Sequence, residues 1–288
     1  MFADDTKVFR NINSIEDMDT LQRDLGELEN WSKKWLLEFH PGKCKVLTVG
    51  NRHLPLYNYK LHNTDIKYVV KEKDIGVTVD CQLNFEEHMN EKINKANSIM
   101  GLIRRTFTYL DEKTFLILFK ALVRPHLEYA NAIWYPYKIK HITSIENVQR
   151  RATKQIPGMK DKSYEDRLRA LKLPTLAYRR LRGDMIEVYK MMSGLYDTAV
   201  PPLLQVYNTR TRGHSKKLFH NRVRKSLRQN FFTNRVISAW NSLPESVINS
   251  IKLQSFERKL DNHWQNQDVF YNITKPTWKL EMKTTSRI

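Results

Sequence analysis

Cysteine is scarce in this sequence, since Cys44 and Cys81 are the only two in 288 residues. Two isolated cysteines are too few for the disulfide framework of a small secreted domain or for a zinc knuckle. The nine histidines include no HExxH motif and no other metal-spaced cluster. We therefore expect two reduced thiols and no structural zinc.

Long apolar runs are missing as well. The longest, TFLILFKALV at residues 114–123, is interrupted by Lys120 and is shorter than the roughly 20 residues that a membrane-spanning helix needs. Acidic residues stand at positions 4 and 5, so the start of the sequence lacks the basic and then apolar pattern of a secretory signal. We expect an intracellular protein of the nucleus or the cytoplasm, without a membrane partner.

Acidic residues are in short supply, with 31 Asp and Glu against 49 Lys and Arg, which gives a formal net charge of +18. Such an excess of positive charge favours an anionic partner, and nucleic acid is the best candidate in a chain with no membrane segment. The sequence contains no Walker loop, no GxGxxG motif and no GxSxG elbow. It therefore offers no signal for a P-loop enzyme, a dinucleotide-binding enzyme or a serine hydrolase.

The hydrophobic content of 41%, with 11% aromatic residues, is enough to build a core. Over residues 1–83 the pattern alternates between strand and helix. Ser14 with Asp17 forms a capping box that begins an amphipathic helix over residues 15–39. Three β-prone runs follow at residues 44–50, 57–70 and 74–80, the second with a turn at Asn63 and Thr64. We predict short antiparallel strands in this part.

From residue 84 onward the period becomes helical. Helices are predicted from Asn84, from Asp111 with a break at Pro125, from a capping box at Thr143 to Glu146, and over residues 164–171 and 176–192. Prolines at 201 and 202 mark a linker over residues 197–208. The predicted fold class is α+β, mostly α. The predicted order is a partial palm-like part (1–83), a helical bundle (84–196), the linker, a basic helical region (209–266) and a tail (267–288).

The basic region begins with a run of cations that no acidic residue interrupts. Its members to residue 228 are Arg210, Arg212, Lys216, Lys217, Arg222, Arg224, Lys225 and Arg228, and Arg235 follows. A solvated face would explain them, but the length of the run favours contacts with nucleic-acid phosphates. Phe231, Phe232, Trp240 and Trp264 are assigned to the core, because aromatic residues at helical spacing usually pack inward.

The stretch MFADDTKVFR places two aspartates side by side just before a β-prone run. Such a pair can be an ordinary solvated turn. Burying both carboxylates would instead require cations to offset their desolvation and repulsion. Mg²⁺, which prefers carboxylate oxygens and leaves positions open for substrate phosphates, is a natural partner. Asp4 and Asp5 are therefore candidate metal ligands.

An ordered series of motifs resembles the reverse transcriptases of non-LTR retrotransposons, those of jockey-like elements in particular. FADD at Phe2 to Asp5 resembles the aromatic-x-Asp-Asp box of the polymerase palm. FHPGKCKVLTVG at residues 39–50 resembles the next palm motif, and the stretch from KDIGVTVD at 73–80 resembles the primer-grip hairpin and the start of the thumb. ALVRPHLEYANAIWYP, IENVQRRATKQI and the segment from FFTNRVISAWNSLP to about Trp264 resemble the region downstream of the polymerase.

This resemblance implies roles for single residues. Asp4 and Asp5 would be the catalytic pair that binds Mg²⁺, and Lys43 would lie near the phosphates of the incoming nucleotide, with Lys45 as its competitor. Gly76 would form the primer-grip turn. The implied partners are an RNA template, a DNA primer and the RNA–DNA hybrid. A solvated turn lysine at 43 and an ordinary strand glycine at 76 remain open alternatives.

The sequence also departs from the family pattern. His40 stands where the family usually has Asn before Pro41 and Gly42. The third metal-binding aspartate and the fingers of the complete enzyme precede the FADD box, so we expect a truncated C-terminal fragment of an RNA-directed DNA polymerase that is inactive alone. A non-catalytic, basic nucleic-acid-binding module is the alternative. A third hypothesis is an unstable relic whose exposed apolar face and strand edge lead to aggregation.

Overall fold

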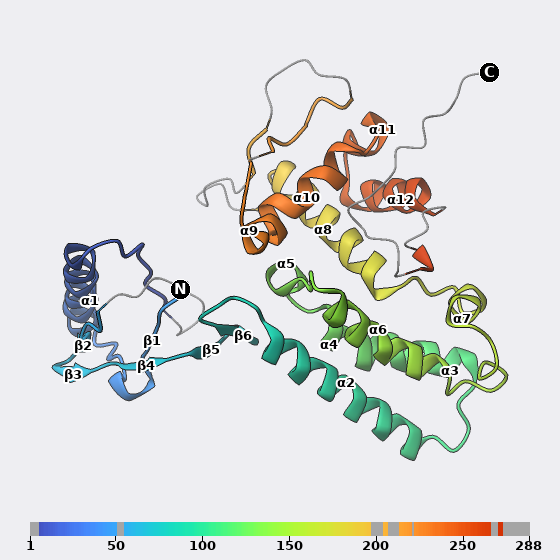
Figure 1. The fold of residues 1–288 in the computed structure, drawn as a ribbon, viewed down its shortest axis with the longest axis horizontal. Coiled ribbons are helices and arrows are strands. Elements are labelled where there is room, and N and C mark those ends of the chain that lie inside the picture. The colour runs from blue at the N-terminus through green and yellow to red at the C-terminus, as the bar shows by residue number, and fades with distance from the viewer. Residues whose placement is uncertain are drawn as a thin grey trace. The chain divides into compact units, whose positions relative to one another are not determined.

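The computed structural model of the chain describes residues 6–50, 55–196, 204–206, 213–220, 222–265 and 270–272. The chain divides into two compact units, Met1–Phe85 and Glu86–Ile288 (Figure 1). Helices predominate and the strands are short, which confirms the predicted α+β, mostly α composition. Each unit is described by itself below.

The first unit contains one long helix, α1 (Ile15–Trp35). Its start agrees with the sequence prediction, because the Asp17 carboxylate accepts a hydrogen bond of 3.2 Å from the backbone N–H of Ser14. The helix ends at Trp35, four residues earlier than predicted, because the next residue, Leu36, adopts a left-handed conformation with φ of 54°. The core of this unit lies between α1 and the strands and consists of Met18, Tyr59, Leu61 and Ile66.

In the described part of this unit, six short strands form three two-stranded ladders: β1 (Lys45–Leu47) with β4 (Lys67–Val69), β2 (Lys60–Leu61) with β3 (Thr64–Asp65), and β5 (Lys71–Asp74) with β6 (Val77–Asp80). The last two ladders are antiparallel, as predicted. The β1–β4 ladder is parallel, so the prediction of antiparallel strands throughout was wrong. The 19 residues from 48 to 66 are long enough for the crossover that parallel strands require. The β2–β3 turn consists of His62 and Asn63, one residue earlier than predicted, and both have positive φ.

The second unit begins with α2 (Glu86–Thr106), followed by α3 (Glu112–Leu118), a π-helical turn (Phe119–Val123), α4 (Arg124–Glu128), α5 (Asn131–Trp134), α6 (Ile139–Thr153), α7 (Tyr164–Ala170) and α8 (Leu176–Met192). Helix α3 begins next to Asp111, as predicted, and the Asp111 side chain caps it by accepting a hydrogen bond of 2.7 Å from the backbone N–H of Thr114. The predicted break at Pro125 takes the form of the π-helical turn, since proline has no N–H to donate to the preceding helical turn.

The C-terminal helices are α9 (Ser226–Asn230), α10 (Phe232–Asn241), α11 (Glu245–Ile248) and α12 (Leu253–Trp264). They share one hydrophobic core with α8, which includes Met185, Val188, Trp240 and Phe256. Figure 1 shows α8 running beside α10 and α12. The helices on both sides of the sequence segment predicted as a linker are therefore parts of one packed structure.

Two predictions in the second unit were wrong. Thr143 to Glu146 does not open a helix, because α6 already begins at Ile139 and Glu146 is fully buried. Among the aromatic residues assigned to the core, Phe232, Trp240 and Trp264 are buried, whereas Phe231 is 47% exposed. Both errors have a tertiary cause: α8 covers Glu146 as described below, and Phe231 precedes α10 at a corner that the core does not reach.

Candidate active site and nucleic-acid interface

The β5–β6 hairpin contains the predicted primer-grip glycine. Its two-residue turn consists of Ile75 with φ of 42° and Gly76 with φ of 78°. Positive φ at both central residues defines the mirror-image turn that matches the twist of paired strands. Gly76 adopts this conformation without strain, whereas the β-branched Ile75 does so at a cost.

The segment after the Asp pair lies against this hairpin. The Lys7 ammonium is 2.5 Å from Oδ2 of Asp74, the residue directly before the turn. Arg10 forms a second ion pair of 3.2 Å with Asp24 on α1, and Ile12 packs against the core of the unit. Asp4 and Asp5 themselves lie outside the described residues. Lys7, two positions after Asp5, thus forms an ion pair with the hairpin that contains Gly76.

Lys43 lies on a different turn, the 3₁₀ helix Pro41–Lys43 that leads into β1. Its backbone N–H donates to the carbonyl of His40 at 3.0 Å, and its side chain is exposed. Lys45 is exposed too, on β1 opposite Lys67, so exposure favours neither lysine over the other. The ring of His40 lies 3.1 Å from the position that a Cβ on Gly42 would occupy. With histidine at position 40, a side chain at position 42 would therefore be crowded, and glycine avoids this contact.

We expect the Ile75→Asn variant to be more stable than the natural chain by about 1 kcal/mol, because Asn tolerates positive φ better than a β-branched residue. Chemical denaturation of both proteins tests this. Val79→Asn, a substitution in the neighbouring strand where φ is ordinary, should destabilise the protein. A loss of stability in Ile75→Asn would show that the Ile75 side chain contributes more than the strained backbone costs.

The residues of the basic run up to Arg228 fall into three groups. Arg210 and Arg212 lie outside the described residues. Lys216 and Lys217 are half-buried, and the Lys216 carbonyl accepts a hydrogen bond from the Trp240 indole at 2.8 Å. The side chains of four residues are exposed: Arg222, Arg224, Lys225 and Arg228. These four form the part of the run whose cations face solvent.

Arg235, the last cation of the run, is instead part of the core. Its guanidinium forms a two-pronged ion pair with the Asp184 carboxylate, with both N–O distances at 2.9 Å. It also donates to the carbonyls of Ala132 and Asn230 at 3.1 and 3.3 Å. The side chains of Arg235 and Asp184 are only 9% and 2% exposed. This pair joins α5, α8 and α10, so it is a structural element and not a nucleic-acid contact.

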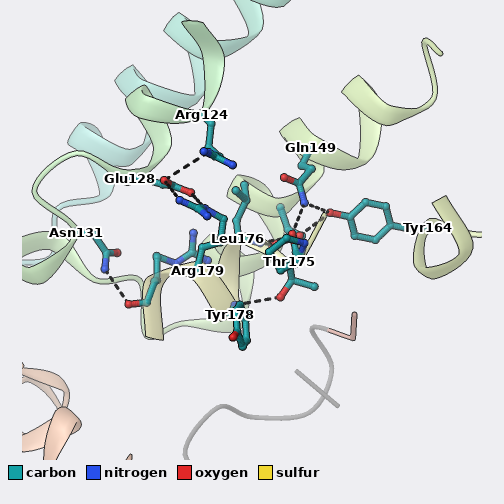
Figure 2. Close-up of polar contacts among 12 residues, drawn as sticks. Arg124, Glu128, Asn131, Gln149, Tyr164, Thr175, Leu176, Tyr178 and Arg179 are labelled. Atoms are coloured by element: carbon teal, nitrogen blue, oxygen red, sulfur yellow. Dashed lines mark hydrogen bonds and ion pairs between the residues drawn. The ribbon is translucent and has the colours of Figure 1, made fainter. Parts of the chain in front are cut away.

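A second buried polar cluster lies at the start of α8 (Figure 2). The Glu146 carboxylate accepts hydrogen bonds from the Leu176 backbone N–H at 3.0 Å and from the Tyr164 hydroxyl at 2.5 Å. Gln149 donates to the same hydroxyl and to the Pro174 carbonyl, both at 3.0 Å. Glu146 therefore supplies a free N–H group at the start of α8 with a hydrogen-bond acceptor.

Burial shifts the titration of these acidic groups. Desolvation raises the pKa of Glu146, while the Tyr164 hydroxyl and the Arg180 guanidinium oppose the shift. Desolvation also raises the pKa of Tyr164. The pKa of Asp184 is raised by the same cause and lowered by Arg235. These shifts reflect structural burial, because the hydrogen bonds of both carboxylates are satisfied by the protein itself.

Glu128 links α4 to α8 close to this cluster (Figure 2). It forms an ion pair with Arg179, in which the Arg179 Nη2 lies 2.9 Å from Oε2. Arg124 approaches the same carboxylate at 3.7 Å. Glu128 of α4 and Glu146 of α6 thus give the first turns of α8 acidic partners from two neighbouring helices.

The sequence interpretation missed this set of buried polar residues. A signal for it was present: Glu146 and Gln149 fall on the same helical face as the buried Ile145, Val148 and Ala152. A charged residue in an apolar stripe indicates a buried partner. The spacing cannot say which distant residue that partner is.

No group of three or more His, Cys, Asp or Glu side chains that could hold a metal ion occurs within the described residues. In the same residues, no helix combines the length and the apolar character needed to cross a membrane.

Comparison with known proteins found two polymerases among its matches. The RNA-directed DNA polymerase from mobile element jockey of Drosophila funebris is 26% identical over 165 residues, which is 54% of this chain and 18% of that protein. The jockey polymerase of Drosophila melanogaster is 25% identical over 186 residues, which is 61% of this chain and 20% of that protein. An uncharacterized protein of Caenorhabditis elegans is 25% identical over 129 residues, 44% of this chain and 65% of that protein.

No family model and no solved structure matches the chain. The matched regions span about a fifth of the two jockey polymerases. The fold and charge describe a basic, mostly helical α+β protein with an ordered hairpin near its start. The two matches to jockey polymerases identify within it a region like the reverse transcriptases of non-LTR retrotransposons.

Proposed function

We propose that this chain is part of an RNA-directed DNA polymerase of a non-LTR retrotransposon, with an RNA template and a DNA primer as partners. Residues 1–83 would form part of the palm, residues 84–196 the thumb, and residues 209–266 a basic region that contacts nucleic acid. The observation that carries the proposal is the Lys7–Asp74 ion pair. It links the segment directly after the FADD box to the hairpin with Gly76. The family resemblance assigns the FADD box to the polymerase palm and the hairpin to the primer grip.

Asp4 and Asp5 are the proposed metal ligands. Their geometry lies outside the described residues, but two carboxylates are oxygen donors of the kind that Mg²⁺ prefers. When bound, Mg²⁺ would stabilise the charge that develops on the transferred phosphate. Lys43, whose exposed side chain is free to extend into solvent, would approach the phosphates of the incoming nucleotide. Gly76 would let the hairpin backbone come close to the primer strand.

We further propose that these 288 residues bind nucleic acid but do not extend a primer by themselves. The family resemblance assigns a third metal-binding carboxylate and the template-holding fingers to residues before the FADD box. Without that carboxylate these 288 residues would have less charge stabilisation at the metal site, and without the fingers they would not position the template.

Primer extension on an RNA template, with Mg²⁺ or Mn²⁺, tests this proposal. We expect no product above that of a protein-free control, for the natural chain and for Asp4→Ala alike. Extension by the natural chain that Asp4→Ala abolishes would overturn the proposed inactivity and confirm the role of Asp4. Extension that survives Asp4→Ala would contradict the assignment of the catalytic pair.

Binding itself should depend on salt through the exposed cations of the basic run. We expect the triple variant Arg222→Gln, Arg224→Gln, Arg228→Gln to bind a single-stranded RNA more weakly. Its slope of log affinity against log salt should fall by up to about 2, since each phosphate contact contributes about 0.7. Fluorescence anisotropy at several salt concentrations measures this slope.

A matched triple variant removes three exposed lysines elsewhere in the second unit: Lys160→Gln, Lys162→Gln and Lys172→Gln. It has the same net charge as the first variant and should keep the natural slope. Equal effects of both variants would show that total charge, and not this part of the run, drives binding. Binding that is absent or indifferent to salt would refute the proposed nucleic-acid contact.

A further inference from the structure

Phe231 is an exposed aromatic residue at the corner between α9 and α10. It is 47% exposed, while the adjacent Phe232 is buried in the core of the second unit. Its position next to a buried neighbour means that the ring is presented to solvent by a well-packed helix end. Single exposed aromatic side chains are common on protein surfaces, so the neighbours of Phe231 decide whether it can form a contact surface.

The corner that holds Phe231 is fastened to the core on both sides. The Asn234 side-chain amide, which is 5% exposed, donates to the Arg228 carbonyl of α9 at 2.7 Å. The buried Arg235 guanidinium donates to the Asn230 carbonyl at 3.3 Å. The Phe231 carbonyl accepts from the backbone N–H groups of Asn234 and Arg235 at 2.9 and 3.0 Å. These bonds hold the backbone of the corner, so the backbone at Phe231 loses little conformational entropy on binding.

One cation lies beside the ring, and the sequence before it is strongly cationic. The Arg228 guanidinium carbon lies 5.1 Å from the centre of the Phe231 ring. Arg222, Arg224 and Lys225, close by in sequence, are exposed as well. No acidic residue occurs in the sequence between Asp197 and Glu245. An aromatic face beside a guanidinium, with further cations near, suits a ligand that combines flat rings with negative charge.

We propose that Phe231 and Arg228 form a stacking platform for unpaired bases of RNA, with the neighbouring cations on the phosphates. The phosphate contacts alone would not distinguish single strands from duplexes. Stacking on Phe231 requires a base that is not already paired and stacked within a helix. The platform therefore gives this surface a preference for single strands. The inference rests on the proposed function, in which the chain binds an RNA template, and it names the part of that template bound here.

The test compares the binding of three labelled probes of one sequence by fluorescence anisotropy: a single-stranded RNA of about 20 nucleotides, the corresponding RNA duplex and a single-stranded DNA. The Phe231→Leu variant keeps an apolar side chain and loses the aromatic face. We expect it to bind the single-stranded RNA about tenfold more weakly, with duplex binding unchanged. Phe231→Tyr keeps the ring and should bind like the natural chain.

Phe107→Leu is the matched control, because Phe107 is 38% exposed in the same unit and also follows two arginines, Arg104 and Arg105. It should retain natural binding. Equal losses in Phe107→Leu and Phe231→Leu, or equal binding of single strands and duplexes by the natural chain, would overturn the platform. Binding of the DNA strand alone would overturn the assignment to RNA. Failure of every probe to bind would refute the proposed function itself, so the two failures are distinguishable.

Discussion

We expect the Arg235→Ala variant to lose about 3–5 kcal/mol in free energy of unfolding. Asp184, whose side chain is 2% exposed, would lose the guanidinium that forms two hydrogen bonds with its buried carboxylate. The carbonyls of Ala132 and Asn230 would lose their donor as well. Urea denaturation followed by tryptophan fluorescence reports this loss, because Trp240 and Trp264 lie in the same core.

Two further variants make this result specific. Arg228→Ala removes an exposed arginine from the same region and should change the free energy of unfolding by no more than about 0.5 kcal/mol. The double variant Asp184→Leu, Arg235→Met removes both charges and should recover much of the stability, since apolar residues of similar volume can replace a buried pair. Equal stability of Arg235→Ala and Arg228→Ala would contradict the structural role of Arg235.

Replacing Glu146 should have the second-largest effect. We expect Glu146→Ala to lower the free energy of unfolding by about 2–4 kcal/mol. The Leu176 N–H and the Tyr164 hydroxyl would lose their acceptor in a buried site, and a cavity would form. Thermal denaturation monitored by circular dichroism measures the loss of the helical unit. Glu165→Ala, a substitution of a more exposed glutamate on α7, should have a much smaller effect.

The isosteric Glu146→Gln variant separates the hydrogen bonds from the charge. Burial raises the pKa of Glu146 above its ordinary value of 4.5. The folded state thus binds the proton more tightly than the unfolded state, and the resulting stabilisation is present below pH 4.5 and is lost as the pH rises toward the raised pKa. The stability of Glu146→Gln relative to the natural chain should therefore improve from pH 4 to pH 7. A constant difference across this range would show that the Glu146 carboxyl titrates normally.

Two predictions that rest on local interactions were correct, whereas the capping box predicted at Thr143 to Glu146 was wrong. Ser14 with Asp17 begins α1, and Asp111 with Thr114 begins α3, because a cap involves residues three positions apart whose geometry the chain itself fixes. The reverse transcriptase-like character was evident from an ordered series of motifs. The roles of Asp4 and Asp5 and of the nucleic-acid contacts stay predictions.

Predictions that depend on distant residues failed or remained open. Glu146 was interpreted as a cap of its own helix, but it serves α8, 30 residues further on. Arg235 looked like one more cation of the basic run until the fold placed it against Asp184, 51 residues away. Phe231 shares the spacing of buried aromatic residues and is nevertheless exposed.

The sequence by itself thus determined the composition of the fold, its local caps, its charge and its resemblance to a polymerase, because these depend on residue type and short spacing. Only the tertiary structure decided which charged residues are buried as pairs and which aromatic ring faces solvent. The physical reason is that the free energy of a charge or an aromatic ring depends on what covers it. In this chain the covering residues come from helices far apart in the sequence.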